Sequence, residues 1–451
     1  MPRAKTILLL AVLLLVAVIS RAANSIVWDT KRDTVSADVR GEALWPLLED
    51  IAHQTGWHIF VEPGLSQKAD AKFSQLNSGE ALKKLLGNLN FAYVPKTDEA
   101  NQLYVFATTL RAATVRVSTA ATNRPAVAKH VANELIVKVK PGTDIDALAK
   151  SLGAKVTGRN DKLGIYRLQF ADAAATDAAL AQLKSNSGVA AVEYNYLLDP
   201  PVSAQKVASA ADKPVSLKLN PPGDSGRVIV GLVDTSIQSL GSELDPFMLK
   251  PVNITGDTVA NGSDPTHATS MAETILRAMA AQGASSSAQI LPVDVYGNSQ
   301  LASTWNVALG VQAAVDGGAT VLNLSLVGTT DSAILSDVIA QAEANGIIVF
   351  AAAGNQPVNT PTYPAADSGV IAVAATQGGQ LAPYSNYGSF IAIALPGASV
   401  VYLGGQTYIV QGTSPATAYA TGIAAGTKSG TSLTWTQILG TMQQKFPVPQ
   451  K

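Results

Sequence analysis

The sequence predicts an α/β protein in which a doubly wound parallel sheet forms the second half and two small α+β domains precede it. Three observations support this prediction. From residue 227 onward, short apolar runs alternate with segments of helical periodicity, as a parallel sheet with crossover helices requires. Two earlier segments, 36–107 and 131–199, alternate strand and helix signals on a smaller scale. The chain of 451 residues is long enough for about three domains.

The first 23 residues have the composition of an export signal. Arg3 and Lys5 precede an apolar run from Ile7 to Ile19, and small residues follow at Ser20 and Ala22. The run is shorter than the roughly 20 residues of a membrane-spanning helix, and retention as an uncleaved anchor is the alternative. The chain contains no cysteine, which excludes a lipoprotein anchor and disulfides. We therefore expect an exported protein, located in the periplasm or outside the cell.

Residues 36–107 predict a small α+β domain. ALWPLLEDIAHQTG has helical spacing and ends at Gly56, and WHIFVEP is a short strand that stops at Pro63. GEALKKLLGNL predicts a second helix, followed by the strands FAYV and QLYVFA. This pattern resembles the short N-terminal domains of secretins and TonB-dependent receptors, which implies a protein partner in the periplasm. A small α+β domain of no particular family is the alternative.

Two stretches of low complexity separate the predicted domains. Residues 108–130 are rich in Ala, Thr and Val, and residues 200–226 contain PPVSAQKVASAADKP and NPPGDSG. Such compositions are typical of linkers. Because an exposed linker is readily cut, we expect a processing site within 200–226.

Residues 131–199 predict a βαββαβ domain. ELIVKVKPG is a strand and turn, DIDALAKSLG a helix that ends at Gly153, and KVTGRNDKLGIYRLQF two strands around a turn. TDAALAQLKSNSG is the second helix and VAAVEYNYLL the last strand. This order by itself predicts a ferredoxin-like domain.

Residues 227–451 predict the parallel sheet. The strands RVIVGLVD, AQILPVDVY, VLNLSLVG and IIVFAAAGN alternate with helical segments. Asp234, Ser325 and Asn355 fall at the carboxyl ends of these strands. Because ligands bind at that edge of such sheets, this edge is the predicted site.

Four polar residues of this domain form a chemically complete set. Asp234 ends VIVGLVD, His267 opens HATSMAETI, Asn355 closes AAAGN, and Ser414 lies in QGTSPATAYATG. A serine hydroxyl needs an imidazole to take its proton and a carboxylate to hold that imidazole. It also needs fixed donors where negative charge develops. The set therefore predicts a serine hydrolase.

The order and the flanks of these residues resemble the subtilase family of serine proteases. The order Asp, His, Ser is that of subtilisin. VGLVDTSI is similar to V-x-V-I-D-T-G-I, HATSMAETI to H-G-T-H-V-A-G-T-I, and GTSPATAYATG to G-T-S-M-A-S-P-H-V-A-G. The resemblance implies that Asp234, His267 and Ser414 are the catalytic triad and that Asn355 donates to the oxyanion beside the Ser414 N–H. It also implies that residues 131–199 are an inhibitory propeptide whose last strand leads into the active-site cleft.

The same resemblance implies which residues bind substrate. The segment Ser325, Leu326, Val327 would pair with the substrate as an extra strand, and Ala352, Ala353 and Gly354 would line the primary specificity pocket. Val327 stands where the family has Gly and would narrow that pocket. Its uncharged walls favour apolar or small side chains of a protein or peptide substrate.

Four residues depart from the family pattern. Ser236, Ala268 and Glu273 stand where the family has Gly, and Ser270 stands where it has His. Glu273 matters most, because a buried carboxylate needs a partner. An inactive adaptor that acts through residues 36–107 is therefore the alternative to the self-processing endopeptidase that we predict. A serine esterase is a further alternative, although the G-x-S-x-G elbow of α/β-hydrolases is absent around Ser414.

Composition excludes several partners. The formal net charge is −1 and only 14% of residues are charged, so no nucleic-acid partner is predicted. The four histidines are dispersed and cysteine is absent, so no metal site and no required cofactor are predicted. Calcium sites occur in many subtilases, but no acidic loop specifies one here.

Overall fold

The computed structural model describes most of the chain, in the ranges 25–30, 32–62, 65, 67–95, 101–110, 113, 115–117, 129–199, 201–207, 216–220, 227–257, 262–283 and 285–450. The predicted export signal lies outside the described residues. Much of the two predicted linkers also lies outside them.

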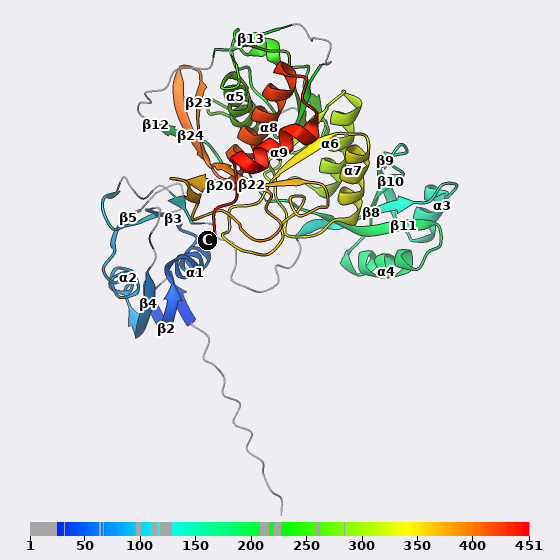
Figure 1. Cartoon of the computed structure of the whole chain (residues 1–451). Helices are drawn as coiled ribbons and strands as arrows, with labels where there is room; N and C mark the ends of the chain where they lie inside the picture. The colour runs from blue at the N-terminus through cyan, green and yellow to red at the C-terminus, as the bar shows by residue number, and fades with distance from the viewer. Residues whose placement is uncertain are drawn as a thin grey trace, which may run out of the picture. The chain divides into compact units, whose positions relative to one another are not determined.

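The chain forms two compact units, residues 1–123 and residues 124–451 (Figure 1). The boundary between them falls inside the stretch that the sequence predicts as the first linker. Unit 1 has an apolar core of its own, built around its two described helices.

In the described part of unit 1, two helices pack on two small sheets. One sheet has the strand order β1-β2-β4 and the other β5-β6-β3-β7. The strands are β1 (Ser25–Asp29), β2 (Thr34–Ala43), β3 (His58–Val61), β4 (Lys68–Leu76), β5 (Asn90–Val94), β6 (Gln102–Phe106) and β7 (Val115–Arg116), and the helices are α1 (Leu44–Thr55) and α2 (Ser78–Leu86). The apolar faces of α1 and α2 bury Leu48, Ile51, Leu82 and Leu85.

Unit 1 is larger than the predicted range 36–107. Strand β1 precedes that range, and β7 follows it and pairs with β3. The sequence analysis also missed β4, KADAKFSQL, because its outer positions are polar and several of its side chains are exposed. The likeness of unit 1 to secretin and TonB-receptor domains stays a prediction.

Unit 2 begins with a four-stranded antiparallel sheet of order β11-β8-β10-β9. Its elements are β8 (His130–Val139), α3 (Ile145–Ser151), β9 (Lys155–Asn160), β10 (Ile165–Gln169), α4 (Ala173–Lys184) and β11 (Val189–Tyr196), in the predicted βαββαβ order. One face of β8 and β10 packs with Leu135 and Leu168 under the module's own helices. The other face places Ile136 and Ile165 in the core of the larger sheet domain. The run from Leu135 to Val137 is apolar because both faces are covered.

The large sheet has eight strands, in the order β15-β17-β14-β18-β19-β20-β21, with β22 paired to β20. The ranges are β14 (Ile229–Asp234), β15 (Val252–Asn253), β17 (Gln289–Asp294), β18 (Val321–Leu324), β19 (Ile348–Ala352), β20 (Ile371–Gln377), β21 (Gln380–Leu381) and β22 (Ile393–Pro396). Every pairing is parallel except that of β21 with β20. The predicted doubly wound α/β class is confirmed.

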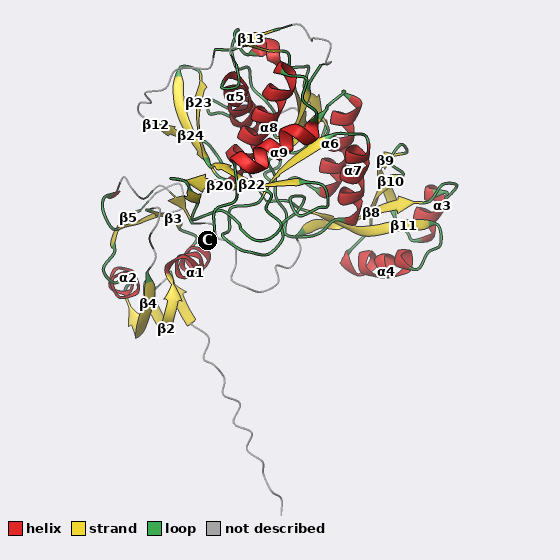
Figure 2. Cartoon of the chain, viewed as in Figure 1, coloured by secondary structure: helices red, strands yellow, loops and turns green. Residues whose placement is uncertain are grey.

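Helices cover both faces of this sheet (Figure 2). Their ranges are α5 (His267–Ala280), α6 (Thr304–Asp316), α7 (Ala333–Ala344), α8 (Thr413–Gly430) and α9 (Trp435–Lys445), with the short 3-10 helix η2 (Asp245–Phe247). Helices α6 and α7 share one core with the β8–β11 module, whereas α5 and α8 pack against each other. Within the described ranges, no helix is both long and apolar enough to cross a bilayer.

Parts of the second predicted linker form strands. Strand β12 (Gln205–Val207) pairs with β24 (Gln406–Gln411), which forms a hairpin with β23 (Ala398–Leu403). Strand β13 (Lys218–Leu219) pairs with β16 (Ser285–Ser286). The low-complexity sequence gives no periodic signal for β12 or β13. Both are strands because they pair with segments far away in the sequence.

The close packing of α5 and α8 is open to a direct test. A Cβ atom at Gly422 would lie 2.4 Å from the backbone oxygen of Ile275 on α5, whereas one at Gly430 of the same helix would meet nothing within 4 Å. We expect Gly422→Ala to lower the free energy of unfolding by about 1–3 kcal/mol, because the two helices must move apart. Gly430→Ala is the control and should leave stability unchanged or slightly raised. Urea unfolding in a Ser414→Ala background, which prevents autolysis, measures both; equal stability of the two variants would contradict the tight contact.

Candidate active site

Asp234 and His267 form a buried pair at the carboxyl edge of the large sheet. His267 Nδ1 lies 2.8 Å from both carboxylate oxygens of Asp234. Only 3% of the His267 side chain and 2% of the Asp234 side chain are exposed. Asp234 is held in turn by the Thr235 backbone N–H, which donates to its Oδ1 at 2.7 Å. This contact places the Nδ1 proton on the side of the carboxylate and leaves Nε2 as a base.

Local sequence places the His267 side chain. Thr266 caps α5 by accepting a hydrogen bond from the Thr269 N–H, so His267 becomes the first residue of the helix. The Thr235 hydroxyl oxygen accepts from the Ala268 N–H at 2.9 Å, which joins the start of α5 to the end of β14. The helix start is therefore tied directly to the strand that carries Asp234.

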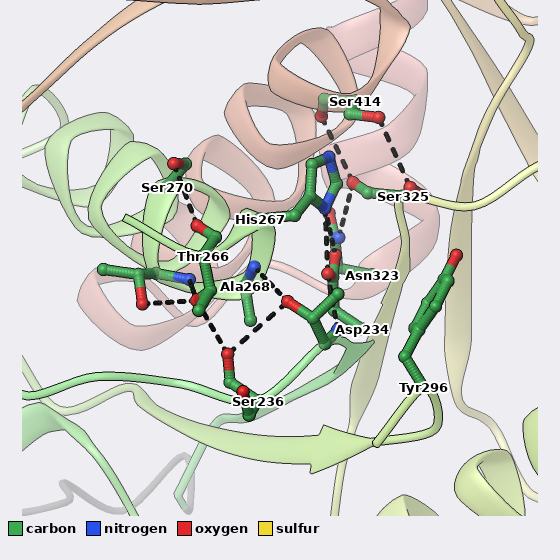
Figure 3. A network of polar contacts seen from close by, with 12 residues as sticks. Asp234, Ser236, Thr266, His267, Ala268, Ser270, Tyr296, Asn323, Ser325 and Ser414 are labelled. Atoms are coloured by element: carbon green, nitrogen blue, oxygen red, sulfur yellow. Dashed lines mark hydrogen bonds and ion pairs between the residues drawn. The ribbon is translucent and has the colours of Figure 1, made fainter. Parts of the chain in front are cut away.

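Ser414 lies at the second position of α8, close to the imidazole. In Figure 3 the ring of His267 extends from Asp234 towards Ser414. Ser414 Oγ donates to the backbone oxygen of Ser325 at 3.3 Å, and Ser325 Oγ donates back to the Ser414 oxygen at 3.2 Å. His267 Nε2 is buried and has no hydrogen-bond partner among the described residues. The serine is thus held beside an unpaired base rather than bonded to it.

Asn355 is hydrogen-bonded to the first residue of α8, the helix that carries Ser414. Its Oδ1 accepts from the Thr413 backbone N–H at 2.8 Å and from the Thr413 hydroxyl at 3.2 Å. Because the amide oxygen is occupied, the amide nitrogen is the group left for a ligand. Gly412, which precedes α8, has a φ of 149°, and a Cβ there would lie 3.1 Å from Asn355 Nδ2.

The enzyme segment that the sequence predicts to pair with substrate, residues 325–327, is hydrogen-bonded to the tail that follows β11. The Asp199 N–H donates to the backbone oxygen of Val327 at 2.8 Å, and the Leu198 N–H donates to Ala302 at 2.9 Å. Leu197 forms an antiparallel bridge with Ser303. The tail that follows β11 therefore lies between two walls, of which the sequence analysis predicted only the first. The wall at 302–303 carries no motif that could have identified it.

The residues of the predicted specificity pocket come together at the end of β19. Ala352, Ala353 and Gly354 are buried, and the Ala353 oxygen accepts from Asn386 Nδ2 at 2.8 Å. Gly354 has a φ of 106°, where other residues are strained. A Cβ at Gly354 would lie 3.4 Å from Val327 Cγ1, so the Val327 side chain reaches this region.

The departures from the family pattern are accommodated without strain. Positive φ among the described non-glycine residues is confined to Asp33, Gln75 and Asn133, so Ser236, Ala268, Ser270 and Glu273 all have ordinary backbone angles. The Ser270 hydroxyl donates to the Thr266 oxygen at 3.1 Å.

Glu273 has the partners that a buried carboxylate requires. Its Oε2 accepts from the Tyr402 backbone N–H at 2.7 Å, and its Oε1 lies 3.3 Å from Arg277 Nη2. Burial nevertheless raises the pKa of Glu273 to about 7. Through its hydrogen bond with the Tyr402 N–H, Glu273 joins α5 to strand β23.

Asn323 is a supporting residue that the sequence analysis missed. Its Nδ2 donates to Ser325 Oγ at 2.8 Å, and its Oδ1 accepts from the Thr421 hydroxyl of α8 at 3.0 Å. The alternation of polar residues in VLNLSL, at Asn323 and Ser325, is the signal that could have identified it. In the part of the chain that the structure describes, no three His, Cys, Asp or Glu side chains gather as a metal cluster.

This fold and this set of polar groups define a serine hydrolase with the residue order Asp, His, Ser. Residues 225–446 match the model of the subtilase family, and residues 116–195 match the fervidolysin N-terminal prodomain. Thermitase of Thermoactinomyces vulgaris is 35% identical over 207 residues, which are 43% of this chain and 72% of that protein. The thermostable alkaline protease of Halalkalibacterium halodurans is 29% identical over 318 residues, which are 68% of this chain and 84% of that protein.

The solved structures agree on the fold. The crystal structure of fervidolysin from Fervidobacterium pennivorans, a keratinolytic enzyme related to subtilisin, superposes with a TM-score of 0.51 at 20% identity, over 66% of this chain and 54% of that chain. The chain belongs to the subtilase family. It is a subtilisin-like serine protease that carries a fervidolysin-like prodomain.

Asn355 should contribute to the transition state more than to substrate binding. We expect Asn355→Ala to lower kcat by roughly 10²–10³ with little change in KM, the range measured for such a donor in subtilisin. Asn355→Asp keeps the acceptor for the Thr413 N–H but removes the donor, and should lose a similar factor. Steady-state hydrolysis of a peptide substrate measures both variants. Full kcat in Asn355→Asp would remove the side-chain donor from the mechanism.

Proposed function

We propose that this protein is an exported serine endopeptidase, made as a zymogen that processes itself and hydrolyses peptide bonds through an acyl-enzyme. The observation that carries the proposal is the buried Asp234–His267 pair, with an unpaired Nε2 beside Ser414. A fluorophosphonate that labels Ser414 in the wild type and not in Ser414→Ala tests it directly. Absence of labelling would favour the inactive adaptor.

The proposed mechanism uses each group at its observed place. His267 Nε2 takes the Ser414 proton as Oγ attacks the peptide carbonyl, and then gives it to the leaving amine. Asp234 stabilises the imidazolium. Asn355 Nδ2 and the Ser414 N–H donate to the oxyanion. Water then attacks the acyl-enzyme, with His267 again acting as the base.

Substrate binding should release the nucleophile. The Ser325 oxygen accepts from Ser414 Oγ in this structure, and it is also the acceptor that an added substrate strand would use. A substrate N–H that donates to Ser325 would displace the serine hydroxyl, which could then turn to His267. Val327 and the residues 352–354 favour an apolar or small side chain next to the scissile bond.

The prodomain module acts as the inhibitor in this proposal. Two polar residues of β11 reach the starts of two helices of the protease domain. Glu193 accepts from the Ser332 hydroxyl at the cap of α7, and Asn195 Oδ1 accepts from the Trp305 N–H of α6 at 3.1 Å. Helix N-termini favour such acceptors because their first N–H groups have no partner within the helix. The module is thereby oriented so that its tail enters the cleft.

The register of the tail supports a particular site of self-processing. The tail is antiparallel to Ser303, and Asp199 donates to Val327. Continued antiparallel to residues 325–327, the tail brings Pro201 opposite Ser325, which directs Ser414 to the bond between Pro201 and Val202. This bond lies inside the predicted range 200–226. Pro201 has no N–H to offer to Ser325, so self-cleavage there should be slow.

The alternatives find less support. An inactive adaptor was suggested by the motif departures, but Ser236, Ala268, Ser270 and Glu273 are unstrained and the chemical groups remain in place. A serine esterase would not need a groove in which a peptide tail pairs with both walls. Turnover of a protein substrate against a small ester separates these two activities. No step of the proposed mechanism uses a calcium ion.

Unit 1 is proposed to bind a protein partner in the periplasm or at the cell surface. Unit 1 has its own core. None of the catalytic residues assigned above belongs to it. Strand β1 is at an edge of its sheet and exposes Val27, which is 64% accessible. An edge strand of this kind accepts an added strand from another chain.

Maturation should depend on Ser414 and on Pro201. We expect Ser414→Ala to accumulate as precursor in a protease-deficient host. Pro201→Ala should mature about 10-fold faster than the wild type, because the new N–H can pair with Ser325. Pro200→Ala is the matched control, because it makes the same substitution one residue earlier, and it should mature at the wild-type rate. Mass spectrometry over time gives rates and cleavage site; equal maturation of wild type and Ser414→Ala would show that another enzyme cuts.

The prodomain should inhibit the mature enzyme in trans, and more strongly at acidic pH. Burial raises the pKa of Glu193 from 4.5 to about 7 in the docked state. Docking therefore takes up a proton between these two values, and its affinity falls as the pH rises through them. We expect the inhibition constant of a chain of residues 129–201 to increase from about pH 5 to about pH 7 and then to level off. Inhibition of peptide hydrolysis at each pH measures this constant.

Two variants separate the contributions of Glu193. Glu193→Gln keeps an acceptor for Ser332 but does not titrate, so its inhibition constant should vary less with pH. Glu193→Ala should weaken inhibition roughly 10-fold or more at every pH, because the Ser332 hydroxyl and the Ile334 N–H lose the acceptor that they have in the docked state. An unchanged pH dependence in Glu193→Gln would show that another group is responsible.

Removal of unit 1 should not affect catalysis. We expect a chain lacking residues 25–117, with residues 1–24 retained, to mature and to hydrolyse peptides at the wild-type rate. Its co-purifying partners or its location should change. Loss of maturation in a folded and exported deletion variant would assign unit 1 to the folding of the zymogen instead.

A further inference from the structure

The chain is paired with the protease domain on both sides of the proposed cleavage site, after it as well as before it. Strand β12 (Gln205–Val207) runs antiparallel to β24, with Gln205 opposite Ile409, Lys206 opposite Tyr408 and Val207 opposite Thr407. Strand β24 ends at Gln411, three positions before Ser414. The chain is thus bound on the leaving-group side of the nucleophile, as the tail at 197–199 is bound on the other side.

The paired segments on the two sides both lead towards Ser414. Continued towards Ser414, the β12 register places Ser203 opposite Gln411. The tail register places Pro201 opposite Ser325, whose oxygen accepts from Ser414 Oγ. The tail register directs Ser414 to the bond between Pro201 and Val202. Strand β24 ends at Gln411, so the β12 register stops short of that bond and does not fix it independently. β12 therefore holds the fourth to sixth residues after that bond.

The strand β24 is held in place by its neighbours in the protease domain. On its other side β24 pairs with β23. Strand β23 is fixed to α5, because the Tyr402 N–H donates to Glu273 at 2.7 Å and the Thr274 hydroxyl donates to Ser399 Oγ at 2.8 Å. The Tyr408 hydroxyl donates to Asp264 at 3.2 Å. The helix that begins with His267 thus also supports this edge.

The contact with β24 makes little use of the β12 side chains. Gln205 and Lys206 are exposed, and Val207 is half-buried. Pairing of this kind depends on backbone N–H and C=O groups and tolerates many sequences. Once β12 leaves, β24 has β23 as its one remaining strand partner in the described structure.

We propose that this edge of β24 is a binding site for extended substrate on the leaving-group side, four to six residues beyond the scissile bond. Residues 205–207 occupy it in the precursor, and a substrate polypeptide occupies it in the mature enzyme. The proposal rests on the proposed protease function. It makes an extended, unfolded segment about ten residues long the preferred substrate, because both ends of such a segment pair with the enzyme. Self-cleavage leaves residues 202–217 attached through β13, so this segment competes for the edge.

Paired peptides test the site in the mature enzyme. Two internally quenched peptides share Leu-Ala-Pro-Leu before the scissile bond; one continues with Val-Ser-Ala and the other with Val-Ser-Ala-Gln-Lys-Val-Ala, the sequence from Val202 onward. We expect kcat/KM to be about 10-fold higher for the long peptide, mainly through KM. The difference should grow in the variant Gln205→Pro, Lys206→Pro, Val207→Pro, whose own segment cannot pair.

N-methylation of the long peptide supplies the matched control. In a paired strand, only alternate N–H groups face the partner. Methylation at the Lys position and methylation at the flanking Gln and Val positions should therefore differ, with one class returning kcat/KM to the value of the short peptide and the other leaving it high. Equal kcat/KM for the short and long peptides, or a length effect without this alternation, would overturn the site and leave the protease function intact.

A failure of the protease function is recognised separately. It appears as no cleavage of any peptide and no fluorophosphonate labelling of Ser414. In that case, binding at the β24 edge is tested by hydrogen exchange of the β24 backbone N–H groups in the full-length Ser414→Ala protein. The triple proline variant should lose protection at residues 407–409, and added Val-Ser-Ala-Gln-Lys-Val-Ala peptide should restore it. Unchanged protection in both experiments would overturn the site.

Discussion

The active site depends on the close packing of α5 against α8. His267 is the first residue of α5 and Ser414 the second of α8, so the distance between base and nucleophile follows from how these two helices meet. Gly422 allows the helices to approach until the Ile275 backbone would touch any added side chain. The sheet supplies the remaining group, because Asp234 ends β14 directly below the start of α5 and binds the imidazole. The catalytic groups are therefore positioned by helices and a strand, which hold a site more accurately than loops do.

Glu273 illustrates how a departure from a family pattern can be absorbed. Where relatives have a glycine, a carboxylate is buried on the helix that carries His267, and isolation there would cost several kcal/mol. The cost is offset because Glu273 accepts the Tyr402 N–H and contacts Arg277, whose guanidinium lies 5.6 Å from the centre of the Tyr402 ring. The residue therefore links α5 to the β23–β24 hairpin. The same link makes that hairpin a firm edge beside the nucleophile.

Backbone pairing is the common principle of both sides of the cleft. Before the proposed scissile bond, the tail pairs with Val327 and Ala302; after it, β12 pairs with β24. Such pairing binds an extended main chain and depends little on its side chains. In the zymogen that we propose, this segment occupies the cleft as a substrate-like strand. In the same proposal, Pro201 has no N–H that could compete with Ser414 for the Ser325 oxygen.

The sequence by itself determined the helices and strands of strong periodicity, and it predicted Asp234, His267, Asn355 and Ser414 as one site, because local patterns and motif flanks carry that information. It also indicated the βαββαβ order of residues 131–199 and the parallel sheet. Only the tertiary structure decided that β1, β4 and β7 complete unit 1, that Glu273 has partners, that residues 302–303 form the second wall, and that β12 lies on β24. These features arise between segments far apart in the chain. Their residues carry no local pattern, because the partner that stabilises each of them is supplied by the fold.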